Sequence, residues 1–233
     1  MWPFSKKLTL RSSGVFGGFT DCHSHILPGV DDGVRTMEES LAILKRYEEL
    51  GVRTVWLTPH IMEDVPNTPA DLRSRFEALR GAYDGGLTLR LGAENMIDNL
   101  FVERLEAGDL LTMGGDGRHL LVETSYFTPP YRFEEILKDV MSKGLRPVLA
   151  HPERYVYMGR GDYERLKALG IRFQLNLFSL AGYYGPEARK KAAALLSKGF
   201  YEYAGSDIHR ISALDASLDV RIDPKALPSF EEL

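Results

Sequence analysis

Short apolar runs alternate with amphipathic segments along most of the chain, a pattern typical of repeated strand–helix units. Apolar runs predict strands at 54–58, 87–92, 120–122, 147–150, 173–175 and 201–204, after an opening strand that carries His23 and His25. Helices are predicted from a capping box at 36–39 to Gly51, from 68 to about 83, and at 99–107, 133–143, 163–169, 186–198 and 213–220. Four helices end at a glycine shortly before the next strand begins, at positions 51, 144, 170 and 199. This regular alternation indicates a βα repeat.

Seven strands and their helices in 233 residues predict a single α/β domain, and we favour a closed parallel barrel. Each predicted strand delivers a polar side chain at its carboxyl end, and a closed barrel gathers those ends on one face. An open doubly wound sheet is the alternative, but it would spread the same ends along a line. We expect the barrel domain to span residues 19–222, with a loosely tied N-terminal extension at 1–18 and a polar tail at 223–233.

A candidate metal site begins at His23 and His25, because side chains two residues apart on an extended segment point to the same side. The full set of candidate ligands is His23, His25, Asp32, His60, Glu94, Glu123, His151, Asp207 and His209. Any one of them could be an ordinary polar residue at a strand end. Nine ionisable groups packed together, however, are costly unless metal ions or opposite charges compensate them. The absence of a thiolate from the set favours Mn or Fe over structural Zn.

Other reactive side chains are interpreted as structural. His119 begins the fourth predicted strand, at the rim opposite the candidate ligands. Cys22 alternates with His23 along the strand and is expected to pack inward, away from any phosphate-binding loop. Ser206 lacks the strand–turn–helix setting of a hydrolase nucleophile. For Tyr183-Tyr184, packing is slightly favoured over stacking against a substrate.

Arg154 follows His151 by three residues and is expected at the mouth of the site. A planar guanidinium beside metal ions suits recognition of a phosphate group. The alternative is a surface ion pair with Glu153 or Glu164.

Composition and charge indicate which kinds of partner and which cellular location to expect. A net charge of −4 gives no reason to expect nucleic-acid binding. The single cysteine allows no intrachain disulfide, which favours a cytoplasmic protein. No apolar run is long enough to predict a transmembrane segment. As a minority interpretation, Trp2 and Phe4 beside Lys6 and Lys7 would make peripheral contact with a membrane complex or partner.

Six short motifs occur in a fixed order between residues 19 and 215. They are HxH at 23–25, Thr58-Pro59-His60, Gly92-Ala93-Glu94, Val122-Glu123, Ala150-His151-Pro152-Glu153-Arg154-Tyr155 and Ser206-Asp207-Ile208-His209. This series resembles the PHP (polymerase and histidinol phosphatase) superfamily and, within it, the bacterial capsule-biosynthesis tyrosine phosphatases of the CpsB/CapC type.

The resemblance implies a distorted seven-stranded (β/α) barrel that holds three divalent ions, usually Mn²⁺, with Fe, Mg or Zn as alternatives. It assigns His23, His25, Glu94 and Asp207 to one ion, Asp32, His60 and His209 to a second, and Glu94, Glu123 and His151 to a third. Glu94 would bridge two ions. Arg154 and Asp207 would be the catalytic residues, with Arg154 also binding the phosphate.

Two departures from the family pattern affect the substrate pocket. Asn95 follows Glu94, where relatives often carry a tyrosine. Arg210-Ile211-Ser212 stands where some relatives place an Arg-Pro-Pro segment, so a role of Arg210 as a second phosphate-binding residue stays open.

The sequence therefore predicts a metal-dependent protein-tyrosine phosphatase that hydrolyses phosphotyrosine through a metal-activated hydroxide. Its expected substrate is a bacterial tyrosine kinase of capsule or exopolysaccharide biosynthesis. The alternatives are a small-molecule phosphatase, such as a histidinol phosphatase, and a non-catalytic metal-binding regulatory module.

Overall fold

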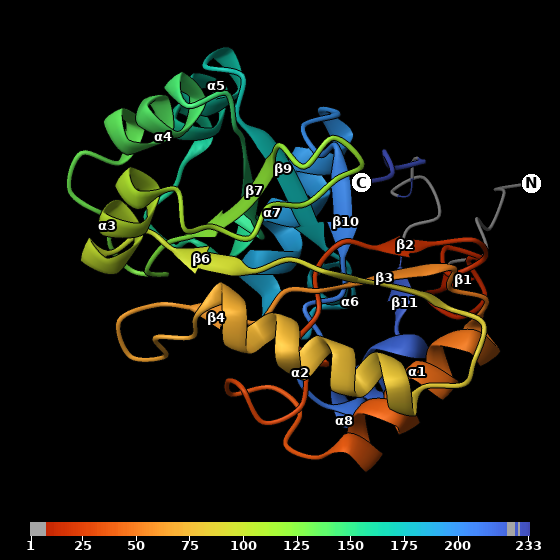
Figure 1. Ribbon diagram of the computed structural model, residues 1–233. Coiled ribbons are helices and arrows are strands. Elements are labelled where there is room, and N and C mark those ends of the chain that lie inside the picture. Colours follow the sequence, from red (N-terminus) through yellow and green to blue (C-terminus); the bar gives the residue numbers. More distant parts are fainter. Residues whose placement is uncertain (1–7, 223–226, 228) are drawn as a thin grey trace, which may run out of the picture.

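A computed structural model describes residues 8–222, 227 and 229–233 (Figure 1). Its helices are α1 Met37–Leu50, α2 Pro69–Ala82, α3 Asn99–Ala107, α4 Phe133–Ser142, α5 Arg160–Ala168, α6 Leu177–Ala181, α7 Pro186–Ser197 and α8 Ile211–Leu218, with a 3₁₀ turn at Pro152–Arg154. Its strands are β1 Leu8–Thr9, β2 Thr20–Asp21, β3 Thr54–Leu57, β4 His60–Ile61, β5 Thr88–Leu91, β6 Glu94–Met96, β7 His119–Glu123, β8 Arg146–Ala150, β9 Arg172–Asn176, β10 Tyr203–Gly205 and β11 Arg221–Ile222.

The strands form a curled, largely parallel arrangement with the helices outside it (Figure 1). Six parallel strands pair in the order β10-β9-β8-β7-β6-β4, and three more pair in the order β2-β3-β5. Figure 1 shows α1, α2 and α8 grouped along one side and α3, α4 and α5 along another. The prediction of a single α/β domain with parallel strands is therefore confirmed.

The expected single sheet of seven continuous strands is not reproduced, because two of the predicted strands are each followed by a break and a further short strand. The run at 54–58 forms β3, and β4 follows it after Thr58-Pro59. The run at 87–92 forms β5, and β6 follows it after a second break. Proline has no N–H to donate to a neighbouring strand, which accounts for the first break. The halves before the breaks belong to the three-stranded sheet, and those after them belong to the six-stranded sheet. Where the two sheets meet, the N–H of Cys22, directly after β2, donates to the carbonyl of Ala204 in β10 (3.2 Å).

Helix boundaries follow the expected local signals closely. The Thr36 hydroxyl accepts from the N–H of Glu39, while the Glu39 carboxylate accepts from the N–H of Thr36, so the predicted capping box is present. Gly51 ends α1 with φ 89°, a conformation that costs glycine no side-chain clash. The short helix α6 was not predicted, because its five residues are all buried and show no amphipathic pattern.

The described terminal segments are packed onto the domain. β1 pairs with β11 in an antiparallel ladder, and Leu10 and Phe16 are buried in the main core. Residues 8–18 are therefore more firmly held than the loosely tied extension expected from the sequence. Leu233 packs near Cys22. Trp2, Phe4, Lys6 and Lys7 lie outside the described residues. Among the described residues, no helix has the length and apolarity needed to cross a membrane.

Candidate metal centre

All nine predicted ligands lie together, most of them at or after the carboxyl ends of strands. The loop after β2 carries His23 and His25, and the segment after β10 carries Asp207 and His209. His60 and Glu94 begin β4 and β6, directly after the two strand breaks, whereas Glu123 ends β7 and His151 follows β8. Most of these side chains are buried, so their charges cannot be satisfied by bulk water.

Four of the donor atoms form a compact group with the size of a metal cage. They are Nε2 of His23, Nε2 of His25, Oε2 of Glu94 and Oδ1 of Asp207. The two nitrogens are 3.1 Å apart, and each lies between 3.1 and 3.4 Å from each carboxylate oxygen. Donors around a tetrahedral ion at ~2.0–2.1 Å are about 3.3–3.4 Å apart, so these residues fit a divalent ion as they stand.

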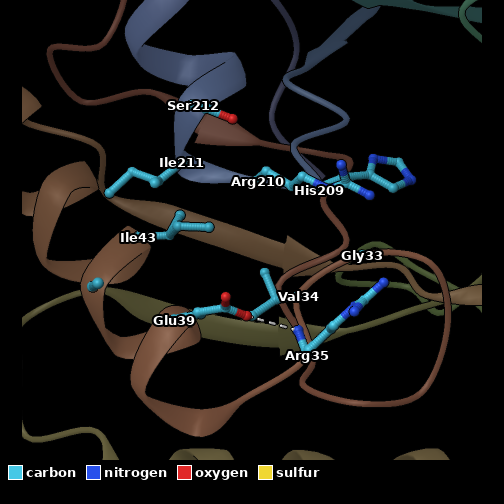
Figure 2. A pocket seen from close by; sticks show the side chains of 10 residues that line it. Gly33, Val34, Arg35, Glu39, Ile43, His209, Arg210, Ile211 and Ser212 are labelled. Atoms are coloured by element: carbon cyan, nitrogen blue, oxygen red, sulfur yellow. Dashed lines mark hydrogen bonds between the residues drawn. The ribbon is translucent and has the colours of Figure 1, made fainter.

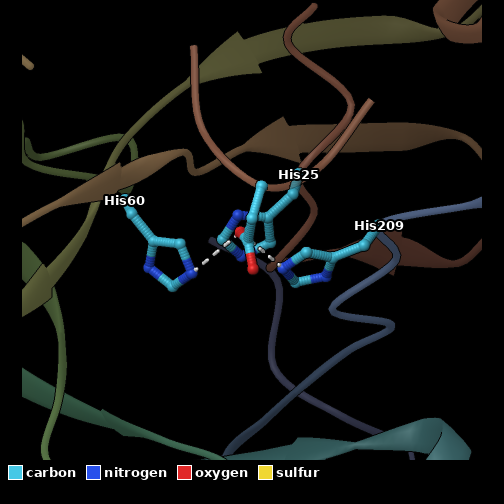
Figure 3. Close-up of side chains that lie close together, drawn as sticks. His25, His60 and His209 are labelled. Atoms are coloured by element: carbon cyan, nitrogen blue, oxygen red, sulfur yellow. Dashed lines mark ion pairs between the residues drawn. The ribbon is translucent and has the colours of Figure 1, made fainter. Parts of the chain in front are cut away.

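A second group lies at the outer edge of the first and combines His25, Asp32, His60 and His209. Oδ1 of Asp32 is 3.2 Å from Nε2 of His209 and 3.5 Å from Nε2 of His60. Figure 3 shows the three imidazole rings converging. The rings of His25 and His209 are stacked, with 4.0 Å between their centroids. The Asp32 side chain is 70% exposed, so this group faces the solvent.

The third group surrounds the carboxylates of Glu94 and Glu123. Nδ1 of His60 lies 3.2 Å from Glu94 and 3.0 Å from Glu123. Nε2 of His151 lies 2.9 Å from Glu94 and 3.9 Å from Glu123. The resemblance assigned His60 to the second ion alone, but its ring stands between the two groups and presents one nitrogen to each.

Unpaired buried atoms also favour metal binding. Glu94 Oε2, Glu123 Oε1 and His60 Nδ1 are buried and, although the nitrogen lies 3.2 and 3.0 Å from the two oxygens, none of the three atoms makes a well-aligned hydrogen bond with a described residue. Buried polar atoms are normally satisfied, and a bound cation would satisfy these carboxylate oxygens. Imidazole and carboxylate donors without a thiolate suit Mn or Fe as well as Zn.

The electrostatics of the cluster call for added positive charge. Burial opposes ionisation of Glu94, but the adjacent histidines His23 and His60 outweigh it and hold the pKa of Glu94 well below its ordinary value. Burial likewise lowers the pKa of His23, but Glu94 and Asp207 outweigh it and raise that pKa to about 9. Protons on the imidazoles thus compensate the carboxylates when no cation does so.

Two residues that sequence reasoning missed orient the paired histidines. The Asp31 carboxylate lies 2.8 Å from Nδ1 of His25 and also accepts from the N–H of His60. The Gln174 side-chain oxygen lies 2.9 Å from Nδ1 of His23. Each contact turns the opposite nitrogen, Nε2, towards the cluster, as partners of ligand histidines commonly do. The only sequence signal was the pairing of Asp31 with Asp32; Gln174 gave none.

The loop that carries Asp31 requires a glycine at position 33. A Cβ placed on Gly33 would lie 2.3 Å from the carbonyl oxygen of His25 and 2.6 Å from its Cβ. The N–H of Gly33 meanwhile donates to Asp31 at 3.0 Å. The close approach of Gly33 to His25 therefore holds the Asp31 carboxylate against the imidazole.

Arg154 contacts the same cluster. Its Nη1 donates to Oδ2 of Asp207 at 2.5 Å, and its guanidinium lies over the rings of Tyr126 and Tyr184, at 4.5 and 4.0 Å from their centroids. The side chain is only 16% exposed. Among the described residues, no other N–H of this guanidinium has a hydrogen-bond partner, so further donors are available for an anion.

The surface ion pair considered for Arg154 does not form. Glu153 is buried and accepts from the Tyr201 hydroxyl at 2.9 Å. Glu164 instead pairs with Arg160. Arg154 therefore belongs to the candidate site.

The residues interpreted as structural are placed accordingly. His119 begins β7 at the end opposite Glu123, and Nε2 lies 3.1 Å from the Tyr203 hydroxyl. Cys22 is 1% exposed, and burial raises the pKa of its thiol. The Ser206 hydroxyl donates to the buried Asp21 carboxylate at 2.7 Å. None of these side chains faces the ligand cluster as a nucleophile would.

Arg210, left open by the sequence, has an exposed side chain with no hydrogen bond or ion pair to any described residue. It lines a pocket next to His209 (Figure 2). Its side chain makes no hydrogen bond or ion pair with Arg154 or Asp207.

Comparison with known proteins adds a family to this geometry. The family model described as capsular polysaccharide synthesis, CpsB/CapC, matches residues 19–219. The chain belongs to the CpsB/CapC family. The tyrosine-protein phosphatase CpsB of Streptococcus pneumoniae is 30% identical over 206 residues, covering 83% of this chain and 84% of that protein. The tyrosine-protein phosphatase YwqE of Bacillus subtilis is 29% identical over 197 residues, covering 82% and 77%.

The fold of this CpsB/CapC protein is also shared with a solved relative. A chain from the crystal structures of B. subtilis YwqE and S. pneumoniae CpsB, described as unique metal-dependent tyrosine phosphatases, aligns with a TM-score of 0.77 at 27% identity. The alignment covers 89% of this chain and 84% of that chain. The resemblance drawn from the motifs is therefore confirmed at the level of the family.

Proposed function

We propose that this CpsB/CapC protein is a metal-dependent protein-tyrosine phosphatase, which hydrolyses phosphotyrosine with water to give tyrosine and inorganic phosphate. The observation that carries the proposal is the convergence of nine imidazole and carboxylate side chains beside Arg154. The names of the relatives supply the substrate class, because they are called tyrosine-protein phosphatases.

The ligand assignment follows the three groups of donors. His23, His25, Glu94 and Asp207 would hold one ion, and Asp32 and His209 a second. Glu94 and Glu123 with His151 would hold a third, and His60 would join the second or third group through one of its two ring nitrogens. We infer Mn²⁺ as the metal, with Fe, Mg and Zn as alternatives, because the donors are hard or intermediate and lack sulfur.

Divalent ions bound there would polarise the phosphate group and activate water at neutral pH. The chain itself supplies positioning. Arg154 would use its unpaired N–H groups to bind a phosphate oxygen while Nη1 stays on Asp207. Tyr126 and Tyr184 would hold the guanidinium in plane. Asp31 would keep Nε2 of His25 directed at the cluster.

The biological setting follows from the family. We propose as partner a phosphotyrosine-containing tyrosine kinase of capsule or exopolysaccharide export, as suggested by the capsular polysaccharide description of the family. A kinase requires ATP, so we place the phosphatase in the cytoplasm, in peripheral contact with a membrane complex. Residues 19–222 would be the catalytic domain, in line with the match at 19–219, and 1–18 and 223–233 its terminal segments. The two curved sheets would act together as a distorted seven-stranded barrel.

The test compares hydrolysis of a phosphotyrosine peptide and of histidinol phosphate, each with and without added Mn²⁺. Rapid, metal-dependent turnover of the peptide supports the proposal. Preference for histidinol phosphate would indicate a small-molecule phosphatase. Metal binding without turnover of either substrate would indicate a non-catalytic regulatory module.

A further inference from the structure

A pocket of about 490 Å³ opens beside the candidate metal centre, between the loop that follows Asp32 and the start of α8. His209 lines this pocket and also belongs to the ligand cluster, so the two sites share a wall. Arg154 lies in contact with Asp207 instead and does not line the pocket. A peptide whose phosphate is bound at Arg154 and the metal centre would therefore place a neighbouring residue at this pocket.

Two arginines stand on opposite sides of the pocket. Figure 2 shows Arg35, from the loop, and Arg210, from the start of α8, with both side chains extending towards the side on which His209 lies. Both are exposed, and neither guanidinium has a hydrogen bond or ion pair with any described residue. By contrast, Arg46 on α1 pairs with Glu49.

The two carboxylates near the pocket, those of Glu39 and Asp32, are engaged in other contacts. Oε2 of Glu39, an acidic side chain that lines the pocket, accepts from the backbone N–H groups of Arg35 and Thr36 as part of the capping box. Asp32 is directed at His209 and His60. The arginines thus leave an excess of positive charge facing the pocket.

Most of the remaining wall is apolar, with Ser212 as its polar member. Val34 and Ile43 are buried beneath the pocket, and Ile211 is 41% exposed at its edge. Apolar contact for methylene groups together with paired guanidinium groups matches the side chain of glutamate or aspartate. A lysine or arginine side chain would meet like charge.

We propose that this pocket recognises an acidic side chain of the phosphopeptide, within two residues of the phosphotyrosine, through Arg35 and Arg210. The separation in sequence is short because the pocket and the ligand cluster share His209, and an extended peptide advances ~3.3–3.6 Å per residue. This inference rests on the proposed tyrosine-phosphatase activity and adds a sequence preference to it. It gives Arg210 a role in carboxylate recognition, not in binding the transferred phosphate.

The experiment measures kcat/KM of the metal-loaded protein on matched phosphotyrosine peptides. Each peptide carries Glu, Gln or Lys at one position before or after the phosphotyrosine, in an otherwise neutral sequence. We expect the best Glu peptide to exceed its Gln counterpart by roughly 5–20-fold at low salt, with Lys below Gln. The preference should shrink as salt is added, because both arginines are exposed.

The variants are Arg35→Gln combined with Arg210→Gln, and a control that combines Arg73→Gln with Arg75→Gln on α2. Both arginines of the control are exposed and neither lines the pocket, so the control removes the same charge without changing the pocket lining. The Glu-to-Gln ratio should fall to about one in the first double variant and stay at the wild-type value in the second. Arg35→Lys with Arg210→Lys should retain part of the ratio, which shows that positive charge matters.

A wild-type ratio near one at every position would overturn the proposal, as would a ratio that survives loss of both pocket arginines. An equal loss of the ratio in the α2 control would assign the preference to overall charge and overturn it as well. Failure to hydrolyse the neutral Gln peptide while other phosphate esters are cleaved would count against the tyrosine-phosphatase function itself, so the two failures are distinguishable.

Discussion

Replacement of Arg154 tests how the site divides phosphate recognition from metal assembly. The guanidinium donates to Asp207 at 2.5 Å and has N–H groups left over for a phosphate. We expect Arg154→Ala to lower kcat/KM on a phosphotyrosine peptide by roughly 10²–10³-fold. Removal of one preorganised hydrogen-bond donor, aimed at charge that develops in the transition state, usually has an effect of this size. It corresponds to about 3–4 kcal/mol of transition-state stabilisation.

The structure also predicts a loss of stability. Arg154 is 16% and Asp207 2% exposed, so removal of the arginine takes one charged partner from a buried carboxylate that keeps His23 and His25. Breaking such a pair costs about 3–5 kcal/mol, and we expect the metal-free variant to approach the lower value because Asn176 still donates to Asp207. Bound cations should reduce the cost further, because they also compensate the carboxylate.

Arg154→Lys should recover little activity. An ammonium group cannot stack as a plane between Tyr126 and Tyr184, nor present a fork to two oxygens. Arg160→Ala serves as the control, because Arg160 lies nearby in the sequence but is exposed and paired with Glu164. That variant should behave as wild type.

The assay combines kcat/KM, bound metal by elemental analysis, and denaturant unfolding with and without chelator. Lost activity with full metal content supports phosphate binding. Parallel loss of metal and activity would make Arg154 a supporting residue of the metal centre, and kinetics within a few-fold of wild type would refute the reasoning altogether.

Four further predictions concern the centre and its surroundings. Chelated protein should lose activity and regain it with Mn²⁺, and undiminished turnover after verified metal removal would contradict the metal requirement. In that chelated state the pKa of His23 is raised to about 9 from 6.5, so its stabilising effect is complete below about pH 6.5 and is lost as pH rises through 9. Denaturant unfolding of the chelated protein should show lower stability at about pH 9 than at about pH 6.5. The apparent affinity for metal should rise between these pH values, because a bound ion displaces the proton of His23. Cys22→Ala should stay active and lose only about 1 kcal/mol of stability, whereas an inactive but folded, metal-loaded variant would point to a thiol mechanism. Asp31→Asn should weaken metal binding by roughly 10–100-fold, measured by competition with a chelator, and unchanged affinity would leave Asp31 with a purely structural role.

The ligand set could be predicted because the βα repeat is visible in the sequence. Each unit ends its strand with a polar side chain, and parallel strands bring those ends to one edge of a sheet. His60 and Glu94 illustrate the strength of this reasoning, because both strands break just before them and yet the two side chains still meet.

The residues that orient the ligands could not be predicted, because their signal exists only in the folded chain. Gln174 reaches His23 from β9, a strand 151 positions away in sequence. Tyr126 lies in a loop with no periodic pattern, and only the stacking on Arg154 reveals its role. The strand breaks were missed for a similar reason, since an apolar run does not show which sheet each half will join.

Two of the candidate ligands lie on strained backbone. His151 and Asp207 have positive φ values of 34° and 52°, which non-glycine residues seldom adopt and which cost about 1–3 kcal/mol each. At Asp207 the conformation is held by a hydrogen bond from its N–H to the carbonyl of His23 (2.8 Å) and by the contact with Arg154. The same turn directs the carboxylate back over the strand ends, towards the histidines. The strained backbone and the ligand cluster thus depend on one another, and a cation that binds the cluster should stabilise the turn as well as the charges.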